Sequence, residues 1–184
     1  MKTKNIVLVL IGILLYMTDA DAQTRFYDTS RTFNEQGFTY VANVIGDGIA
    51  GGIVRLNNRD TRWIGRDQTN RDGTPRGFGR TVEENNSVQM QQLARTIIQN
   101  AFTPAERQRL GGYSMEVILF MNPDTGVVDD VQFVFGITSG FATIPVTTYR
   151  RIELELKNRL RFVPTAEGRR RLFLTLAIWD VVVN

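Results

Sequence analysis

Apolar side chains at spacings of three and four predict two long helices in the second half of the chain. The first begins near Ser87, with Asn86 or Ser87 as its N-cap, and the second covers residues 147–161. Between them, residues 103–106 have the pattern of a capping box with proline in the first turn, which predicts a short helix ending at residues 111–112. The apolar positions of the two long helices are Met90, Leu93, Ala94, Ile97, Ile98 and Ala101, and Tyr149, Ile152, Leu156 and Leu160.

Five runs rich in β-branched, aromatic and aliphatic residues predict strands. Residues 46–48 favour a turn between the first two runs, and residues 122–126 favour a hairpin turn between the next two, because Pro presets φ and Gly supplies a positive φ. Residues 57–80 follow no regular period, and we expect long loops around Trp63 there. The expected strands are residues 38–45, 49–56, 113–121, 127–135 and 171–183.

The order of these elements indicates an α+β fold. The last hundred residues read helix, strand, turn, strand, helix, strand, so the first of these strands can lie centrally. We expect an antiparallel sheet with a β-β-α-β C-terminal unit and helices on one face, preceded by a β-rich N-terminal segment. The expected plan is a signal peptide at residues 1–22, a β-rich segment with arginine- and glycine-rich loops at 23–85, and an α-β-β-α-β domain at 86–184.

The first residues have the pattern of a secretory signal peptide. Lys2 and Lys4 precede an uncharged run at residues 6–17, and residues 20–22 offer the small-x-small pattern that a signal peptidase cuts. The run is shorter than the roughly 20 residues that a membrane-spanning helix needs. The alternative is a buried N-terminal core helix. We therefore expect an exported protein, periplasmic or extracellular, that meets the membrane only through its cleaved signal peptide.

Composition excludes several kinds of chemistry. The chain of 184 residues is 42% hydrophobic and 22% charged, which is typical of a folded globular protein, and it contains no His and no Cys. Zinc fingers, disulfides, Cys/His pairs and Ser-His-Asp triads are excluded. Residues 46–51 match a dinucleotide-binding glycine pattern, but strand-forming residues follow, which favours a hairpin turn. We expect no catalytic residue, no metal site and no cofactor.

Three aspartates near the second predicted hairpin suggest structural roles rather than paired-carboxylate catalysis. Asp124 lies in the turn, where its side chain can cap the backbone. Asp129 and Asp130 are adjacent on a strand, so we expect them to point to opposite faces of the sheet.

The last predicted strand is apolar on both faces, whereas an antiparallel strand with one wet face alternates. It therefore needs a second cover, which is the N-terminal segment, a twin subunit or a partner. We identify this strand as a candidate edge for a partner segment, because main-chain groups at an edge can pair with an extended peptide. The candidate edge residues are Arg171, Phe173, Thr175, Ala177 and Trp179.

Residues 55–80 form a basic segment in which arginines alternate with Trp63 and Phe78. Seven arginines stand against three aspartates, in a chain whose net charge is +3. This pattern fits an anion-binding surface for phosphate or acidic glycans, and it fits equally a solvated loop with local Arg–Asp pairs. Nucleic acid is a less expected ligand. The candidate anion-binding residues are Arg55, Arg59, Arg62, Arg66, Arg71, Arg76 and Arg80.

Residues 117–131 resemble the strand, Pro-Asp-x-Gly turn and valine-rich return strand of TonB-type C-terminal domains. Residues 155–164 are similar to that family's helix end and aromatic-x-Pro exit, and residues 172–183 to its last strand. The resemblance covers the last 70–100 residues and implies a module that offers an exposed edge, commonly its last strand, to a partner segment. This chain has scattered prolines instead of a Pro-rich spacer, so only the fold and the docking style carry over.

These observations predict a secreted or periplasmic, non-catalytic module that binds a protein or peptide at a sheet edge. The expected partner is a cell-envelope protein or peptide, or a second copy of the chain. The alternative is an anion-binding protein that uses the segment Arg55–Arg80. An enzyme is the least expected class, because no signature motif for Asp/Glu, Tyr or Ser chemistry is present.

Overall fold

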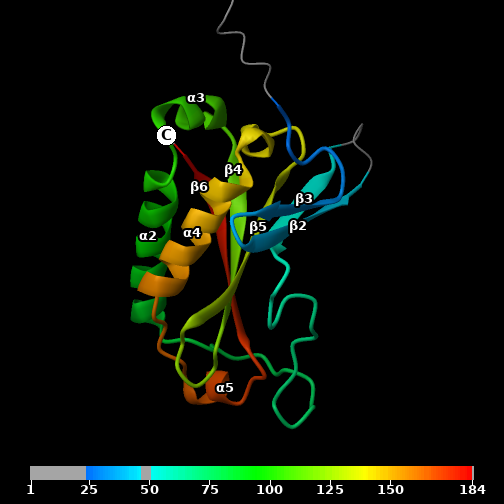
Figure 1. The fold of residues 1–184 in the computed structure, drawn as a ribbon. Helices are drawn as coiled ribbons and strands as arrows, with labels where there is room; N and C mark the ends of the chain where they lie inside the picture. The colour runs from blue at the N-terminus through cyan, green and yellow to red at the C-terminus, as the bar shows by residue number, and fades with distance from the viewer. Residues whose placement is uncertain (1–23, 47–50, 184) are drawn as a thin grey trace, which may run out of the picture.

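A six-stranded antiparallel sheet organises the chain (Figure 1). The computed structural model describes residues 24–46 and 51–183. The strand order is β1-β2-β3-β5-β4-β6, so β4 is central in the C-terminal unit, as the sequence predicted. The strands are β1 (Arg31–Glu35), β2 (Phe38–Ile45), β3 (Ile53–Asn58), β4 (Ser114–Met121), β5 (Val128–Gly136) and β6 (Leu174–Val182).

Helices α2 and α4 pack on one face of this sheet, and the predicted α+β class is confirmed. Strand β3 pairs with β5, so the N-terminal segment and the C-terminal unit share one sheet. A short 3₁₀ helix lies in the stretch that the sequence assigned to a loop. The helices are α2 (Glu84–Asn100), α3 (Pro104–Leu110), η1 (Gly140–Thr143), α4 (Val146–Arg159) and α5 (Ala166–Arg169).

The β4–β5 hairpin shows why its turn has this sequence. The Asn122 side chain accepts hydrogen bonds from the backbone N–H groups of Asp124 and Thr125, at 2.9 and 3.1 Å. Gly126 has a φ of +67°, and a Cβ there would lie 1.8 Å from the Phe162 carbonyl oxygen. Only glycine fits this position, so the turn and the chain that leaves α4 are packed together. The turn between β2 and β3 includes residues 47–50, which lie outside the described residues.

Helix α2 begins at Glu84, earlier than the predicted cap at Asn86 or Ser87. Its N-cap, Glu83, makes no side-chain capping bond. The Asn86 amide instead accepts a hydrogen bond from the Val163 N–H at 2.8 Å. The polar residue that resembled a cap thus joins α2 to the chain after α4. The capping box of α3 is confirmed, since the Thr103 and Glu106 side chains each bond the other residue's backbone N–H.

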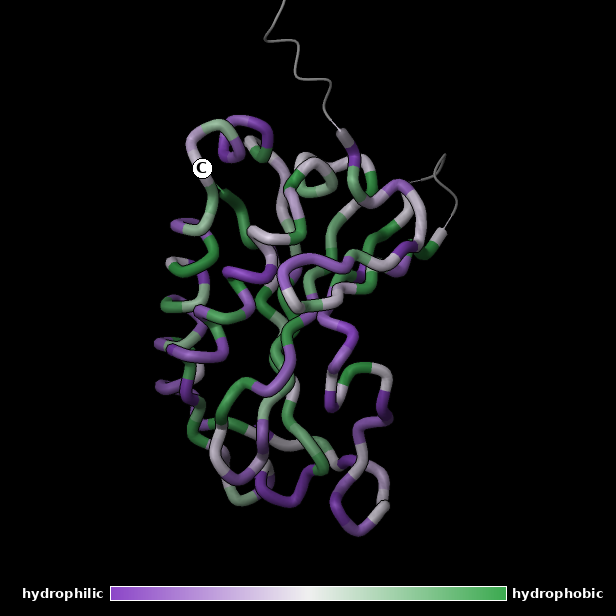
Figure 2. The backbone as a smooth tube through the Cα atoms, viewed as in Figure 1, coloured by the Kyte–Doolittle hydropathy of each residue, from purple (hydrophilic) through white to green (hydrophobic). Residues whose placement is uncertain are grey.

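The two faces of the sheet are covered differently. Between the sheet and the helices lies the main core, in which Leu56, Leu119 and Phe133 pack with Tyr149 and Ile152 of α4, all fully buried. The opposite face carries a smaller apolar cluster at its α5 end. The loop after β3, residues 59–80, supplies Trp63 to this cluster. Figure 2 shows that this loop is largely polar, in contrast to the apolar strands. Among the described residues, none of the helices is long and apolar enough to cross a membrane.

Strand β6 begins at Leu174, three residues later than the sequence predicted. The preceding residues leave the ladder with β4 and pair with the loop that follows β3. The Leu172 N–H donates to the Thr69 carbonyl and the Arg71 N–H to the Arg170 carbonyl, both at 2.9 Å. The loop therefore stands where β4 has already ended, and it satisfies the backbone that β4 no longer reaches.

Candidate site at the edge of strand β6

Strand β6 lies at one edge of the sheet, next to β4. Peptide groups of an antiparallel strand point alternately to its two sides. The hydrogen bond from the Arg59 N–H to the Thr39 carbonyl, 2.8 Å long, fixes this alternation between β2 and β3. The registers of the following strand pairs extend the same alternation through β5 and β4 to β6. The peptide groups of Thr175 and Ala177 consequently point away from β4, toward the outside of the sheet.

Helix α2 covers the outer side of the C-terminal half of β6. The Arg95 guanidinium donates to the Trp179 carbonyl at 2.7 Å and to the Asp180 carbonyl at 3.2 Å. Gln99 donates in the same way to a carbonyl near the end of the strand, at 3.3 Å. The part of the edge that a partner strand can reach is therefore the N-terminal half.

The two aromatic residues of the predicted edge set have different surroundings. Phe173 is buried, and the Trp63 ring stacks on it with centroids 5.3 Å apart and planes 20° apart. Phe120 contacts the same ring at 6.0 Å. Trp179 is 62% exposed. The second cover that this strand requires is thus provided in part by the N-terminal segment of the chain itself.

Asp129 and Asp130 hold this cover in place. One Asp130 carboxylate oxygen accepts hydrogen bonds from the Arg62 and Trp63 N–H groups, at 2.8 and 2.7 Å, and Asp129 accepts one from the Trp63 indole at 2.9 Å. The prediction that the two aspartates point to opposite faces is wrong, because the register between β4 and β5 shifts beside Phe120. Burial raises the pKa of Asp130, and the two N–H groups partly offset this rise.

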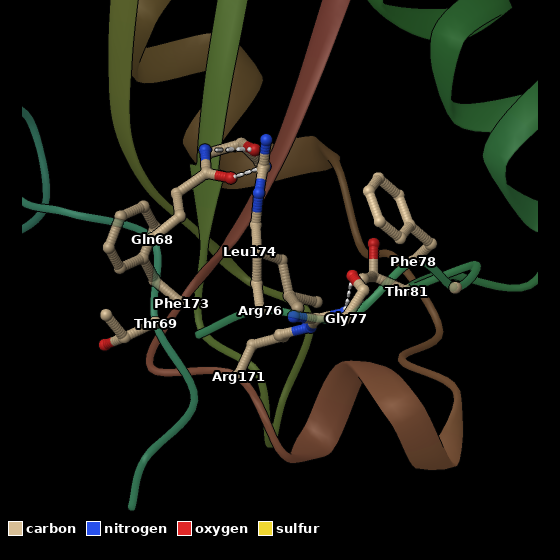
Figure 3. A pocket seen from close by; sticks show the side chains of 11 residues that line it. Gln68, Thr69, Arg76, Gly77, Phe78, Thr81, Arg171, Phe173 and Leu174 are labelled. Atoms are coloured by element: carbon tan, nitrogen blue, oxygen red, sulfur yellow. Dashed lines mark hydrogen bonds between the residues drawn. The ribbon is translucent and has the colours of Figure 1, made fainter. Parts of the chain in front are cut away.

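A pocket of about 420 Å³ lies between the beginning of β6 and residues 76–79 (Figure 3). Arg171 and Thr175 of the predicted edge set line it, together with Arg76 of the predicted anion-binding set. Arg76 donates to the Gln68 side chain, and the Gln68 amide donates to the Thr175 hydroxyl at 2.8 Å. The structure thus brings Arg76 to the candidate edge, and Arg71 also lies there, because its Nε donates to the Arg171 carbonyl at 3.2 Å.

The arginines of that set do not form a single cluster, although Arg55 and Arg59 line a second pocket of about 520 Å³ beside β2 and β3. Arg55 lies on β3, and Arg66 lies 5.9 Å from the centroid of the Trp63 ring. Four others form ion pairs with acidic neighbours, which accounts for their charge without a ligand. These pairs join Arg59 to Asp60, Arg62 to Asp129, Arg71 to Asp124 and Arg80 to Glu84.

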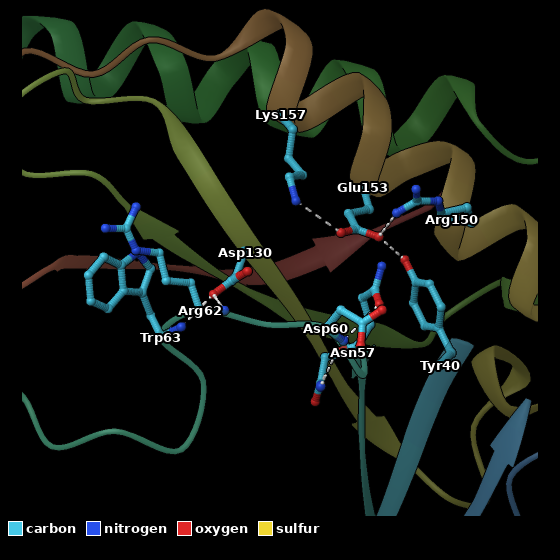
Figure 4. A network of polar contacts seen from close by, with 10 residues as sticks. Tyr40, Asn57, Asp60, Arg62, Trp63, Asp130, Arg150, Glu153 and Lys157 are labelled. Carbon is cyan, nitrogen blue, oxygen red and sulfur yellow. Dashed lines mark hydrogen bonds and ion pairs between the residues drawn. The ribbon is translucent and has the colours of Figure 1, made fainter. Parts of the chain in front are cut away.

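A buried ionic cluster lies on the helix-facing side of the sheet (Figure 4). The Tyr40 hydroxyl of β2 donates to the Glu153 carboxylate of α4, which is 1% exposed. Arg150 and Lys157 reach the same carboxylate at 2.9 and 3.4 Å. Burial, and then the charge of Glu153, raises the pKa of Tyr40, so the hydroxyl remains a donor. This cluster joins α4 to β2 and lies outside the pocket.

The pocket offers donors suited to an anion or to a peptide backbone. Its polar side chains are guanidinium, hydroxyl and amide groups, and the residues that line it include no carboxylate. Within residues 24–46 and 51–183, no three acidic side chains come together in a way that could hold a metal ion.

A family model described as Domain of unknown function (DUF5043) matches residues 23–179. The chain belongs to the DUF5043 family. It is similar to the crystal structure of a DUF5043 family protein from Bacteroides uniformis ATCC 8492, with 27% sequence identity and a TM-score of 0.76. The similarity covers 86% of this chain and 95% of the other. No curated protein matches the sequence.

The sequence alone indicates no role for Gln68 of this DUF5043 site, and it marks Phe78 only as an aromatic neighbour of the arginines. Gln68 connects the arginine loop to β6, but an isolated glutamine in a polar loop carries no signal. Phe78 lines the pocket and is fully exposed. Its signal is the order Gly77-Phe78-Gly79, an aromatic residue between two glycines in a polar segment, which is unusual for a residue that packs in a core.

Proposed function

We propose that this chain is an exported, non-catalytic binding protein that takes an extended segment of a protein partner along the N-terminal half of β6. One observation carries the proposal. The outward peptide groups of Thr175 and Ala177 lie at a sheet edge, and a pocket opens beside them. Main-chain pairing with such an edge supplies affinity, and pockets beside it accept side chains of the bound segment.

Two further features support this function. The docking style of TonB-type C-terminal domains, which the last hundred residues resemble, uses a last strand as the edge. The family match begins at residue 23, directly after the predicted signal-peptide cleavage site, which supports export. Binding of a polyanion is the second candidate, and it is supported less, because four of the seven arginines are already paired with carboxylates.

The test uses peptides selected from a library of random dodecapeptides on immobilised residues 23–184. Their affinities are then compared for the wild type and Thr175→Pro. Proline removes the outward N–H, so we expect binding to weaken about tenfold, the equivalent of one lost hydrogen bond. Ala177→Pro is the second edge variant, in case the first does not fold.

Two controls make this result specific. Thr32→Pro removes an N–H that also points outward, but from β1 at the opposite edge, and we expect it to leave binding unchanged. Thr175→Val removes the hydroxyl that Gln68 contacts and keeps the N–H, so binding should persist. Failure to select any peptide, or equal binding by folded Thr175→Pro and wild type, contradicts the proposal.

A further inference from the structure

The pocket beside β6 contains a buried arginine whose hydrogen bonds are incomplete. The Arg171 side chain is 6% exposed. Its Nη2 donates to the Glu167 carboxylate at 2.7 Å and to the Gly77 carbonyl at 2.8 Å. Its Nε and Nη1 atoms are buried and have no partner among the described residues. Buried polar groups are nearly always hydrogen-bonded, so these two nitrogen atoms point to an acceptor that is not part of the chain.

A second arginine adds charge to the same pocket. Arg76 contacts the neutral Gln68 side chain, and no carboxylate lies within ion-pair distance of it among the described residues. The Glu167 carboxylate, which contacts Arg171 beside the pocket, is already shared by Arg171 and, at 3.8 Å, by Arg170. The pocket therefore carries positive charge that its own residues do not neutralise.

The remaining walls suit a peptide more than a free ion. Phe173 and Leu174 give the pocket an apolar side, and Thr175 connects it to the outward peptide groups of β6. Segment 76–79 forms the opposite wall, and its Gly77 carbonyl accepts a hydrogen bond from Nη2 of Arg171. The Nε and Nη1 atoms of Arg171 are buried in the unbound chain, so a ligand group reaches them only after a local movement. Segment 76–79, in which two of four residues are glycines, has a backbone that permits such a movement.

We propose that the segment bound at β6 carries an acidic residue whose carboxylate enters this pocket between Arg76 and Arg171. Guanidinium groups present paired N–H donors that match the two oxygens of a carboxylate. This inference rests on the proposed function and adds the chemical class of the ligand: an extended peptide with Asp or Glu opposite the beginning of β6.

The experiment uses the dodecapeptides selected on residues 23–184. We expect Asp or Glu to recur at one position of these peptides. Replacement of that residue by Asn or Gln should weaken binding to the wild type about tenfold, as expected for a hydrogen bond to a charged group. Sodium acetate at high concentration should compete, whereas the same ionic strength of sodium chloride should compete less.

Variants of the protein test whether the pocket distinguishes a charged carboxylate of the peptide from a neutral amide. With Arg76→Gln, the acidic peptide and its amide analogue should bind with nearly equal affinity. Arg159→Gln is the matched control, because this arginine is on α4 and pairs with Glu155 there. Arg171→Met should abolish the preference as well if it folds, but Arg76→Gln, which changes an exposed side chain, decides the question without it.

The outcomes distinguish a failure of the carboxylate inference from a failure of the proposed edge binding. Selected peptides without a recurring acid, or equal binding of the acid and amide forms by the wild type, overturn the carboxylate inference and leave edge binding intact. Selection of no peptide overturns both. An acidic preference that survives Arg76→Gln and folded Arg171→Met places the carboxylate elsewhere and also contradicts the inference.

Discussion

Asp130 joins two parts of the chain that are far apart in sequence. It lies on β5 and accepts hydrogen bonds from the N–H groups of Arg62 and Trp63. These two residues precede Asp130 by 68 and 67 positions. Because it is buried, its carboxylate loses hydration, and the two hydrogen bonds only partly compensate. The residue therefore stabilises the position of Trp63 at a cost in electrostatic free energy.

Substitution of Asp130 should separate these two effects. Asp130→Ala leaves two N–H groups without an acceptor and should lower the free energy of unfolding by about 2–3 kcal/mol. Asp130→Asn keeps an acceptor oxygen without the buried charge, so we expect its stability at pH 7 to stay within about 1 kcal/mol of the wild type. Urea unfolding followed by tryptophan fluorescence measures both.

The pH dependence of stability has a defined sign at this residue. The pKa of Asp130 is higher in the folded protein than the ordinary value of about 3.9. The stability that the protonated side chain contributes is therefore fully present below the ordinary pKa. It is lost as the pH rises through the pKa of the folded protein. We expect Asp130→Asn to gain stability relative to the wild type between pH 4 and pH 7. A gain in the opposite direction contradicts the burial argument.

At the scale of elements, α2 and the loop after β3 together limit the exposed part of β6. Arg95 of α2 occupies carbonyls of the C-terminal half, and Trp63 covers the apolar ring of Phe173. A bare apolar edge strand pairs with other chains, and charged side chains against the edge prevent this. The part of the edge that α2 leaves open is thereby limited to the N-terminal half of β6.

Removal of the Arg95 side chain should extend the open edge. We expect Arg95→Ala to lose only about 1 kcal/mol of stability, because water can hydrogen-bond the two carbonyls that lose their donor. We also expect this variant to form dimers at high protein concentration. Light scattering after size-exclusion chromatography measures the dimer. Arg159→Ala removes an arginine from α4 without touching β6 and should remain monomeric. If both variants remain monomeric, α2 does not protect the edge.

At the scale of the whole molecule, local patterns predicted the elements, and long-range contacts decided what lies against them. The capping box of α3 and the Asn122–Gly126 turn could be predicted because their interactions lie within a few residues. The i,i+4 spacing of Glu153 and Lys157 is typical of an ion pair on the solvent side of a helix. The pair exists, but Glu153 is buried, because Tyr40 meets it from a strand 113 residues earlier.

In the candidate site, too, the strand could be predicted from the sequence and its tertiary surroundings could not. The last strand could be identified as an edge from the order of elements and from the resemblance to TonB-type domains, and its two apolar faces indicated that it needs a second cover. Its pocket could not be predicted, because the pocket depends on the path of residues 57–80, which follow no period. The convergence of Arg76 and Arg171, 95 positions apart, arises from that path. Charge counting alone indicated seven equivalent arginines, whereas tertiary contacts place Arg76 and Arg71 near the beginning of β6.

We propose above that the N-terminal half of β6 pairs with an extended partner segment. Amide hydrogen exchange, measured residue by residue by NMR on residues 23–184 with and without a selected dodecapeptide, tests it most directly. The account predicts that the amides of Thr175 and Ala177 exchange at least about tenfold more slowly in the complex, as expected when each gains a hydrogen bond. The outward amides of β1, at the other edge, should keep their rates. Protection at β1 with none at β6 would contradict the account.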